Sequence, residues 1–283
     1  MSAALRFGYV DTAHGQMHYR AAGVGEPRTR NIMLLHWTPG SGAQYDAILH
    51  EFARRGFRAF APDLAGYGAS PGGAQNWLIP DFANNVLEIA QVLTPAPFAL
   101  LGGHLAAEIA AQAARMAPER ISHLLLDGSP TWDWDFRHKL LADIKPSAPV
   151  PTEDGSHLVK WWQHILWELK MWQPDFKLDE NGSAQAMRVL MNDLQSRFDF
   201  SGLRALAEFE MAHCLPELKM PTLALSAATD PLRDQHEKVL ALLPTARGHV
   251  FTGAHPIHNP RRAAEYADVV VDFIENTTSP RFQ

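Results

Sequence analysis

One stretch near the middle of the chain, residues 100–110, most constrains the fold. It begins with an apolar run ending at Leu101, as in a buried strand, and continues into an alanine-rich segment typical of a helix. Gly102 and Ala106 stand two residues before and two residues after His104. Small side chains at these positions let a strand and a helix close on each other around a strained turn. The pattern therefore predicts a strand–elbow–helix unit with His104 at its apex.

The small residues beside His104 also admit a plainer interpretation. Gly102 and Gly103 could form only a flexible strand–helix junction, with His104 as an ordinary first helical residue. Glu108 lies one turn further along the helix, where it could pair with the imidazole or favour the helix N-terminus. The rest of the chain favours the elbow, because other candidate functional residues also follow directly after predicted strands.

Apolar strands and helical segments alternate along most of the chain. Strands are predicted at 7–11, 16–20, 31–35, 57–61, 98–101, 121–126, 222–226 and 249–252, and helices near 43–55, 76–93, 231–243 and 260–274. This alternation predicts an α/β fold with a mostly parallel eight-stranded sheet, helices on both faces, and a functional site at the carboxyl ends of the strands.

The alternation stops between residues 131 and 215, where helical periodicity dominates. Six of the chain's eight tryptophans fall between Trp132 and Trp172. We expect residues 131–215 to form a helical cap, or lid, inserted into an α/β core made of residues 1–130 and 216–283. The tryptophans lead us to expect that Trp132, Trp161 and Trp162 line a substrate pocket over His104.

Composition narrows the classes of partner. The chain has 283 residues, 46% of them hydrophobic, and a formal net charge of −6. Such a charge disfavours nucleic acid and anionic membrane surfaces as partners. Cys214 is the only cysteine, which fits a reducing compartment, and the N-terminal residues lack the apolar core of a signal peptide. We expect a soluble cytoplasmic protein and leave a homodimer open.

Four further segments carry a resemblance to a known family. They are the loop His36-Trp37-Thr38-Pro39-Gly40, the turn-rich run at 62–70, Asp230 before Pro231, and His255 within Gly253-Ala254-His255-Pro256. Their spacing and order are similar to those of the α/β-hydrolase fold superfamily, in which elbow, acid and histidine follow one another along the chain.

The resemblance implies a role for each residue. His255 matches the general base and Asp230 the acid that orients it, with Asp127, which also follows a strand, as the alternative acid. The backbone N–H groups of Trp37 and Leu105 match the oxyanion hole. The family usually has serine where this chain has His104, so an acyl-serine mechanism is excluded. His36 is expected near the substrate, where it can also hydrogen-bond the surrounding loops.

Three roles for His104 remain open from the sequence: a nucleophile, a general base acting with His255 and Asp230, or a residue that only binds ligand. The leading expectation is hydrolysis of a small, largely apolar, carbonyl-containing substrate, either an ester, a lactone or an activated C–C bond. The alternatives are a non-hydrolytic lyase, cyclase, decarboxylase or cofactor-free oxygenase, or a catalytically degenerate ligand-binding protein.

No cofactor is expected. The first buried strand is not followed by G-x-G-x-x-G, and no P-loop lysine is present. His36, His104 and His255 could converge as metal ligands, but this alternative is not favoured, because ligand pairs at helical spacing such as H-x-x-x-H are missing near the site.

Overall fold

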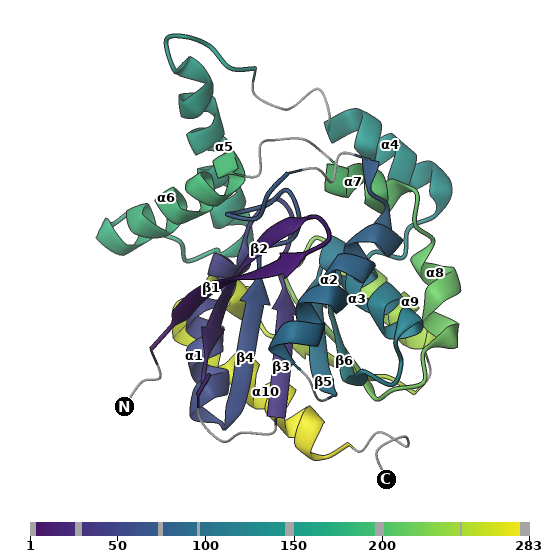
Figure 1. Ribbon diagram of the computed structural model, residues 1–283. Helices are drawn as coiled ribbons and strands as arrows, with labels where there is room; N and C mark the ends of the chain where they lie inside the picture. The colour runs from purple at the N-terminus through teal and green to yellow at the C-terminus, as the bar shows by residue number, and fades with distance from the viewer. Residues whose placement is uncertain are drawn as a thin grey trace.

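The protein is built around one eight-stranded sheet (Figure 1). The computed structural model describes residues 4–25, 30–72, 76–94, 97–144, 150–195, 201–243 and 245–277. The strands are β1 (Arg6–Thr12), β2 (Gly15–Ala22), β3 (Arg30–Leu35), β4 (Phe57–Pro62), β5 (Phe98–Gly103), β6 (Ile121–Asp127), β7 (Thr222–Ala227) and β8 (Arg247–Phe251). Their order in the sheet is β1-β2-β4-β3-β5-β6-β7-β8.

Most neighbouring strands run parallel, as predicted. The N-terminal hairpin pairs β1 with β2 and β2 with β4 in antiparallel fashion, and the pairs from β4 through β3, β5, β6 and β7 to β8 are parallel. The carboxyl ends of the parallel strands therefore meet at one edge of the sheet, where functional residues of this architecture gather.

Helices cover both faces of the sheet. One face packs against α2 (Ile79–Leu93), α3 (Leu105–Met116) and α9 (His236–Leu242), and the other against α1 (Asp46–Arg54) and α10 (Ala263–Glu275). Successive strand residues point to opposite faces. Leu35 and Leu124 join the core beneath α3, whereas Leu34 and Leu125 join the core beneath α1. Burial on both sides explains why residues 32–35 of β3 and 124–126 of β6 are all apolar.

Several helices begin later than the sequence predicted. The predicted helices at 43–55, 231–243 and 260–274 each open with a 3-10 turn, at Gly42–Tyr45, Arg233–Gln235 and Pro260–Arg262. α2 begins at Ile79 rather than near residue 76, with Pro80 in its first turn. Proline fits there because the first helical N–H groups lack partners within the helix.

A helical insertion joins β6 to β7 at the carboxyl edge of the sheet (Figure 1). It contains α4 (Trp134–Ile144), α5 (Ser156–Trp172), α6 (Glu180–Gln195), α7 (Ser201–Ala207) and α8 (Met211–Cys214). These helices occupy the segment where the sequence predicts a cap. The exact division into a core of residues 1–130 and 216–283 and a cap of residues 131–215 stays a prediction.

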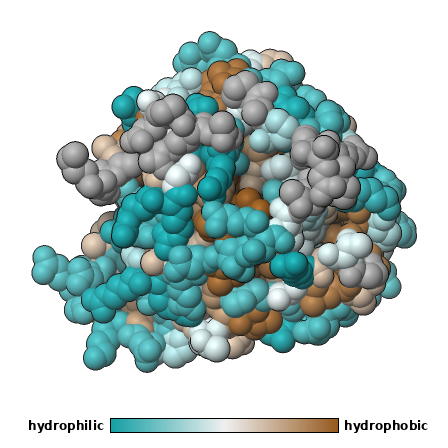
Figure 2. All heavy atoms as spheres, turned by 90° about the horizontal axis from the view of Figure 1, so that it is seen from below, coloured by the Kyte–Doolittle hydropathy of each residue, from teal (hydrophilic) through white to brown (hydrophobic). Residues whose placement is uncertain are grey.

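The face opposite the insertion is mostly hydrophilic, with apolar side chains between the polar ones (Figure 2). Within the described ranges, each helix is too short or too polar to cross a membrane.

The α5–α6 pair of the insertion has a small core of its own. Ile165, Leu169, Ala186 and Leu190 are buried between the two helices. Asp193 in α6 is buried as well, at 4% exposure. Burial raises the pKa of Asp193 to about 8; the charge of Glu168 adds to the rise, and a hydrogen bond from Trp161 opposes it.

This carboxyl should make stability fall as pH rises. Asp193 stays protonated in the folded protein up to about pH 8, but in the unfolded chain its pKa has the ordinary value of 3.8. We expect Asp193→Asn to raise the melting temperature by about 3 °C or more at pH 8.5, and by less than half of that at pH 5.5. The exposed Asp175 of the insertion provides the control variant Asp175→Asn. Thermal unfolding at both pH values would contradict the prediction if the gain from Asp193→Asn did not depend on pH.

Candidate active site

The turn at His104 has the geometry of an elbow. His104 has φ 50° and ψ −122°, and it is the one non-glycine residue with positive φ in the described part of the chain. A Cβ atom at Gly102 would lie 2.1 Å from the carbonyl oxygen of Ala106. Strand and helix therefore approach too closely for a larger residue, and the backbone at His104 is strained. The interpretation as a merely flexible junction does not account for this geometry.

The imidazole of His104 lies between a carboxylate and an indole. Its Nε2 is 3.4 Å from Oδ1 of Asp230, and its side chain retains 16% exposure. The ring stacks on Trp37, with the two ring centroids 3.6 Å apart and the planes 14° from parallel. A Cβ at Gly103 would fall 1.7 Å from Nε1 of Trp37, so the missing side chain at 103 makes room for the indole.

Asp230 comes from the loop directly after β7. Its Oδ1 accepts a hydrogen bond of 2.7 Å from the backbone N–H of Leu232, so the carboxylate also supports its own turn. Burial raises the pKa of Asp230, but hydrogen bonds from His104 and Leu232 and the nearby histidine charges outweigh that effect and leave the pKa lowered. Asp230 is thus ionised at neutral pH.

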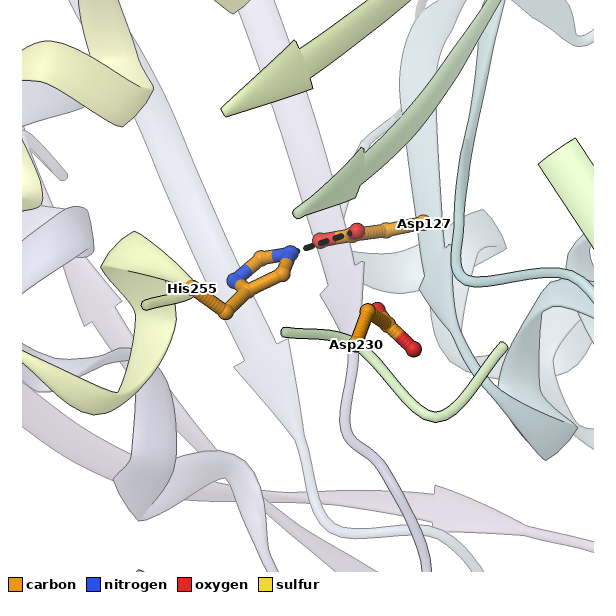
Figure 3. A group of neighbouring side chains, drawn as sticks. All are labelled: Asp127, Asp230 and His255. Atoms are coloured by element: carbon orange, nitrogen blue, oxygen red, sulfur yellow. Dashed lines mark hydrogen bonds and ion pairs between the residues drawn. The ribbon is translucent and has the colours of Figure 1, made fainter. Parts of the chain in front are cut away.

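His255 lies in a separate, buried pair. Its Nδ1 accepts the backbone N–H of Ile257 at 3.2 Å, which places the proton of the neutral ring on Nε2. Nε2 donates to Oδ1 of Asp127 at 2.8 Å, and the hydroxyl of Tyr266 in α10 donates to Oδ2 at 2.6 Å. His255 is 1% exposed. Figure 3 shows the ring directed at Asp127, with Asp230 beside the pair.

The two histidines are therefore paired differently from the arrangement that the sequence resemblance implies. The acid hydrogen-bonded to His255 is Asp127, the alternative acid, whereas Asp230 contacts His104. The physical reason is the length of the side chain at the elbow. An imidazole at the elbow is long enough to meet Asp230 itself, which a serine hydroxyl would not be.

His36 supports the loops around the site. It is fully buried; the backbone N–H of Leu64 donates to Nε2 at 3.0 Å, and Nδ1 donates to the carbonyl of Trp37 at 2.9 Å. Burial lowers the pKa of His36. Both ring nitrogens serve the backbone, so the position of this residue favours the loop-bonding role over direct contact with substrate.

The predicted pocket tryptophans lie in different parts of the insertion. Trp161 and Trp162 of α5 pack against the small core between α5 and α6. Trp132 precedes α4 and stacks obliquely on Phe136, with the ring centroids 4.9 Å apart. Trp37, from the loop after β3, is the tryptophan that contacts His104. The roles of Trp132, Trp161 and Trp162 in substrate binding stay predictions.

The structure contains a buried polar cluster behind the elbow that the sequence does not predict. Glu108 faces the charges of Arg137 and Glu210 rather than serving only the helix terminus. Arg137 of α4 is 2% exposed; it donates to the carbonyls of Ala207 (3.1 Å) and Trp132, and to Glu210 (2.9 Å). Burial raises the pKa of Glu108 well above its ordinary value, and the charge of Arg137 opposes this rise. The sequence gives no signal for this cluster, since its members are spread over three helical segments.

One group of side chains could in principle hold a metal ion. Potential ligand atoms of Asp127, Asp230 and His255 lie within 4.8 Å of one another. Both oxygens of Asp127 already accept hydrogen bonds, from His255 and Tyr266. This bonding favours a hydrogen-bonded network over a cation site. His36, His104 and His255 are also poorly suited to hold a metal ion, because both ring nitrogens of His36 are hydrogen-bonded to backbone groups.

Comparisons with known proteins identify the family of this chain. A family model described as alpha/beta hydrolase fold matches residues 30–258. The pimeloyl-[acyl-carrier protein] methyl ester esterase of Aliivibrio salmonicida is 27% identical over 248 residues, covering 84% of this chain and 88% of that protein. An uncharacterized protein of Mycobacterium tuberculosis is 28% identical over 116 residues, 41% of this chain, and the match spans 33% of that protein's length.

Solved structures share the architecture at lower identity. The enol-lactonase of Burkholderia xenovorans LB400 has a TM-score of 0.75 and 18% identity, covering 95% of this chain and all of that one. An esterase from Exiguobacterium antarcticum has a TM-score of 0.74 and 17% identity, covering 96% of this chain and all of that one. With the family match over most of its length, the chain belongs to the α/β-hydrolase fold family.

Proposed function

We propose that this protein hydrolyses small, largely apolar esters or lactones, with His104 as a general base that Asp230 orients. The observation that carries the proposal is the pair itself: an imidazole at a strained elbow, 16% exposed, with Nε2 3.4 Å from a buried carboxylate. A histidine held by an aspartate is the proton-transferring half of a serine-hydrolase triad. In this chain the histidine of such a pair, His104, is itself the elbow residue, so no serine hydroxyl lies between it and the substrate.

The proposed reaction uses water as the nucleophile. Water adds to the carbonyl carbon while His104 takes its proton; the C–O bond then breaks, and the alkoxide leaves with the proton from His104. Asp230 is ionised and stabilises the imidazolium between the two steps. Leu105 begins α3, where N–H groups lack partners within the helix, which supports its N–H as an oxyanion donor together with that of Trp37.

His255 has a supporting part in this proposal. Its hydrogen bonds to Asp127 and Ile257 tie the loop after β8 to the end of β6. To act as the base that the family resemblance implies, His255 would have to break its hydrogen bond to Asp127. The ester and lactone chemistry is supported by the relatives, among which are an esterase for a methyl ester and an enol-lactonase.

The test is turnover of 4-nitrophenyl acetate, butyrate and octanoate, and of simple lactones, against an equal concentration of free imidazole. We expect steady hydrolysis without a burst, a normal solvent deuterium isotope effect, and no acyl group on the His104 peptide after acid quenching. A burst with a labile acyl-imidazole would make His104 a nucleophile instead of a base. Saturable binding of these esters without hydrolysis would contradict the proposal and favour a non-hydrolytic enzyme or a binding protein.

A further inference from the structure

A cavity of about 650 Å³ lies between the insertion and the core. Its walls are α6, the start of α1 with the 3-10 turn before it, and the segment 256–263 that follows His255. Neither His104 nor Asp230 is among its lining residues, so the cavity is distinct from the elbow. Its volume falls within the range of about 300–1,000 Å³ that small-molecule sites occupy.

One part of the lining is apolar. Ile48 from α1, Val189 and Met191 from α6, and Ile257 from the loop after β8 contribute aliphatic side chains. Such a surface gains free energy when an alkyl or aryl group displaces water from it, at about 25 cal/mol per Å² of buried apolar area. The insertion thus supplies one apolar wall and the core supplies the others.

The polar part of the lining carries a net positive charge. Nη1 of Arg20 lies 3.1 and 3.3 Å from the two oxygens of Asp46, and the charge of Arg188 also acts on Asp46. Two guanidinium groups therefore face one carboxylate. The lining therefore has one positive charge more than it has carboxylates, which suits it to a second carboxylate.

We propose that this cavity binds an amphiphilic carboxylate. The alkyl or aryl part lies against Ile48, Val189 and Ile257, and the carboxylate is held by Arg188 at the exposed end, while Arg20 stays paired with Asp46. The inference rests on the cavity alone and does not require the ester hydrolysis proposed above.

The occupant would touch both loops that flank the elbow. Ile257 lines the cavity and donates its N–H to Nδ1 of His255. Asn192 lines it from α6 and accepts a hydrogen bond of 3.0 Å from Ser41, next to the loop that carries Trp37. A carboxylate bound here would stabilise α6 against the core, because it contacts both sides of the cavity.

The experiment compares octanoate, octanol and acetate by isothermal titration and thermal unfolding of the whole chain at low salt. We expect octanoate to bind saturably, at least about tenfold more tightly than octanol, because its carboxylate accepts charge-assisted hydrogen bonds from a guanidinium that a neutral hydroxyl does not match. Acetate, which lacks the apolar part, should not bind measurably. Arg188→Gln should reduce the octanoate affinity to nearly that of octanol, and Ala47→Leu, which fills the cavity, should abolish binding of both.

Arg54→Gln is the matched control, because Arg54 lies on α1, is 65% exposed and does not line the cavity. Equal affinities for octanoate and octanol, or an unchanged octanoate affinity in Arg188→Gln, would overturn the carboxylate assignment. Octanoate binding that survives in a folded Ala47→Leu variant would place the ligand elsewhere. All of these readouts are independent of turnover, so a failed esterase assay would not affect them.

Discussion

Replacing His104 by asparagine is expected to lower kcat/KM for ester hydrolysis by about a thousandfold or more, as loss of an essential base does. Asparagine tolerates positive φ better than most residues, which keeps the elbow backbone in place. It has no basic nitrogen, so the proton from water has no acceptor at the apex. Steady-state kinetics with a 4-nitrophenyl ester, together with circular dichroism and melting temperature, measure activity and fold separately.

His104→Ser distinguishes the two histidines. His255 is hydrogen-bonded to Asp127 and buried, so we expect the new hydroxyl to find no base and the serine variant to be as inactive as His104→Asn. High esterase activity in His104→Ser would show that His255 can turn toward the elbow and act as the base. Near wild-type activity of His104→Asn would remove His104 from the mechanism altogether.

Arg137→Met is expected to destabilise the folded protein by about 3–5 kcal/mol, because it removes the three hydrogen bonds of a side chain that is 2% exposed, and a buried group left unpaired costs about 1–3 kcal/mol. Methionine has a similar length but donates no hydrogen bond. The carbonyls of Trp132 and Ala207 and the carboxylate of Glu210 would each lose their donor. At about 2–4 °C per kcal/mol for a chain of this size, the melting temperature should fall by roughly 10 °C.

Two further variants show whether the loss of stability in Arg137→Met comes from the burial of Arg137 or only from its charge. Arg115→Met removes an arginine whose partner Glu217 is 3.5 Å away and 57% exposed, and it should cost less than about 1 kcal/mol. Glu108→Gln should leave stability near pH 7 almost unchanged, because burial raises the pKa of this carboxyl and glutamine is an uncharged side chain of the same size. Equal losses in Arg137→Met and Arg115→Met would contradict the structural role given to the buried cluster.

The fold could be predicted because its determinants are local. Strand segments buried on both faces are apolar, as residues 32–35 and 124–126 are, and the close approach of Gly102 to Ala106 requires small residues at fixed spacing. Helix starts were predicted less well, because the 3-10 turns at Gly42–Tyr45 and Pro260–Arg262 are too short for their period of about three residues per turn to be distinguished from that of an α-helix.

That His104, Asp127, Asp230 and His255 lie close together could be predicted from the sequence, but which aspartate contacts which histidine could not. Asp127 and Asp230 follow neighbouring strands and reach the same edge of the sheet, so spacing alone cannot assign each to a histidine. The assignment depends on side-chain length at the elbow: the ring of His104 extends to Asp230, and His255 is bonded to Asp127. Tyr266, which completes the second pair, lies in the last helix and has no sequence signature.

The hydrogen bond from Tyr266 in α10 to Asp127 has a consequence for biosynthesis. A chain emerging from the ribosome exposes the elbow and both carboxylates long before α10, because domains are made from the N-terminus onward. Until α10 docks, Asp127 lacks one of its two donors and the loop of His255 lacks its packing partner. Completion of this hydrogen-bonded group is thereby delayed until the chain has been translated past Tyr266, so a nascent or truncated chain carries His104 without its finished surroundings.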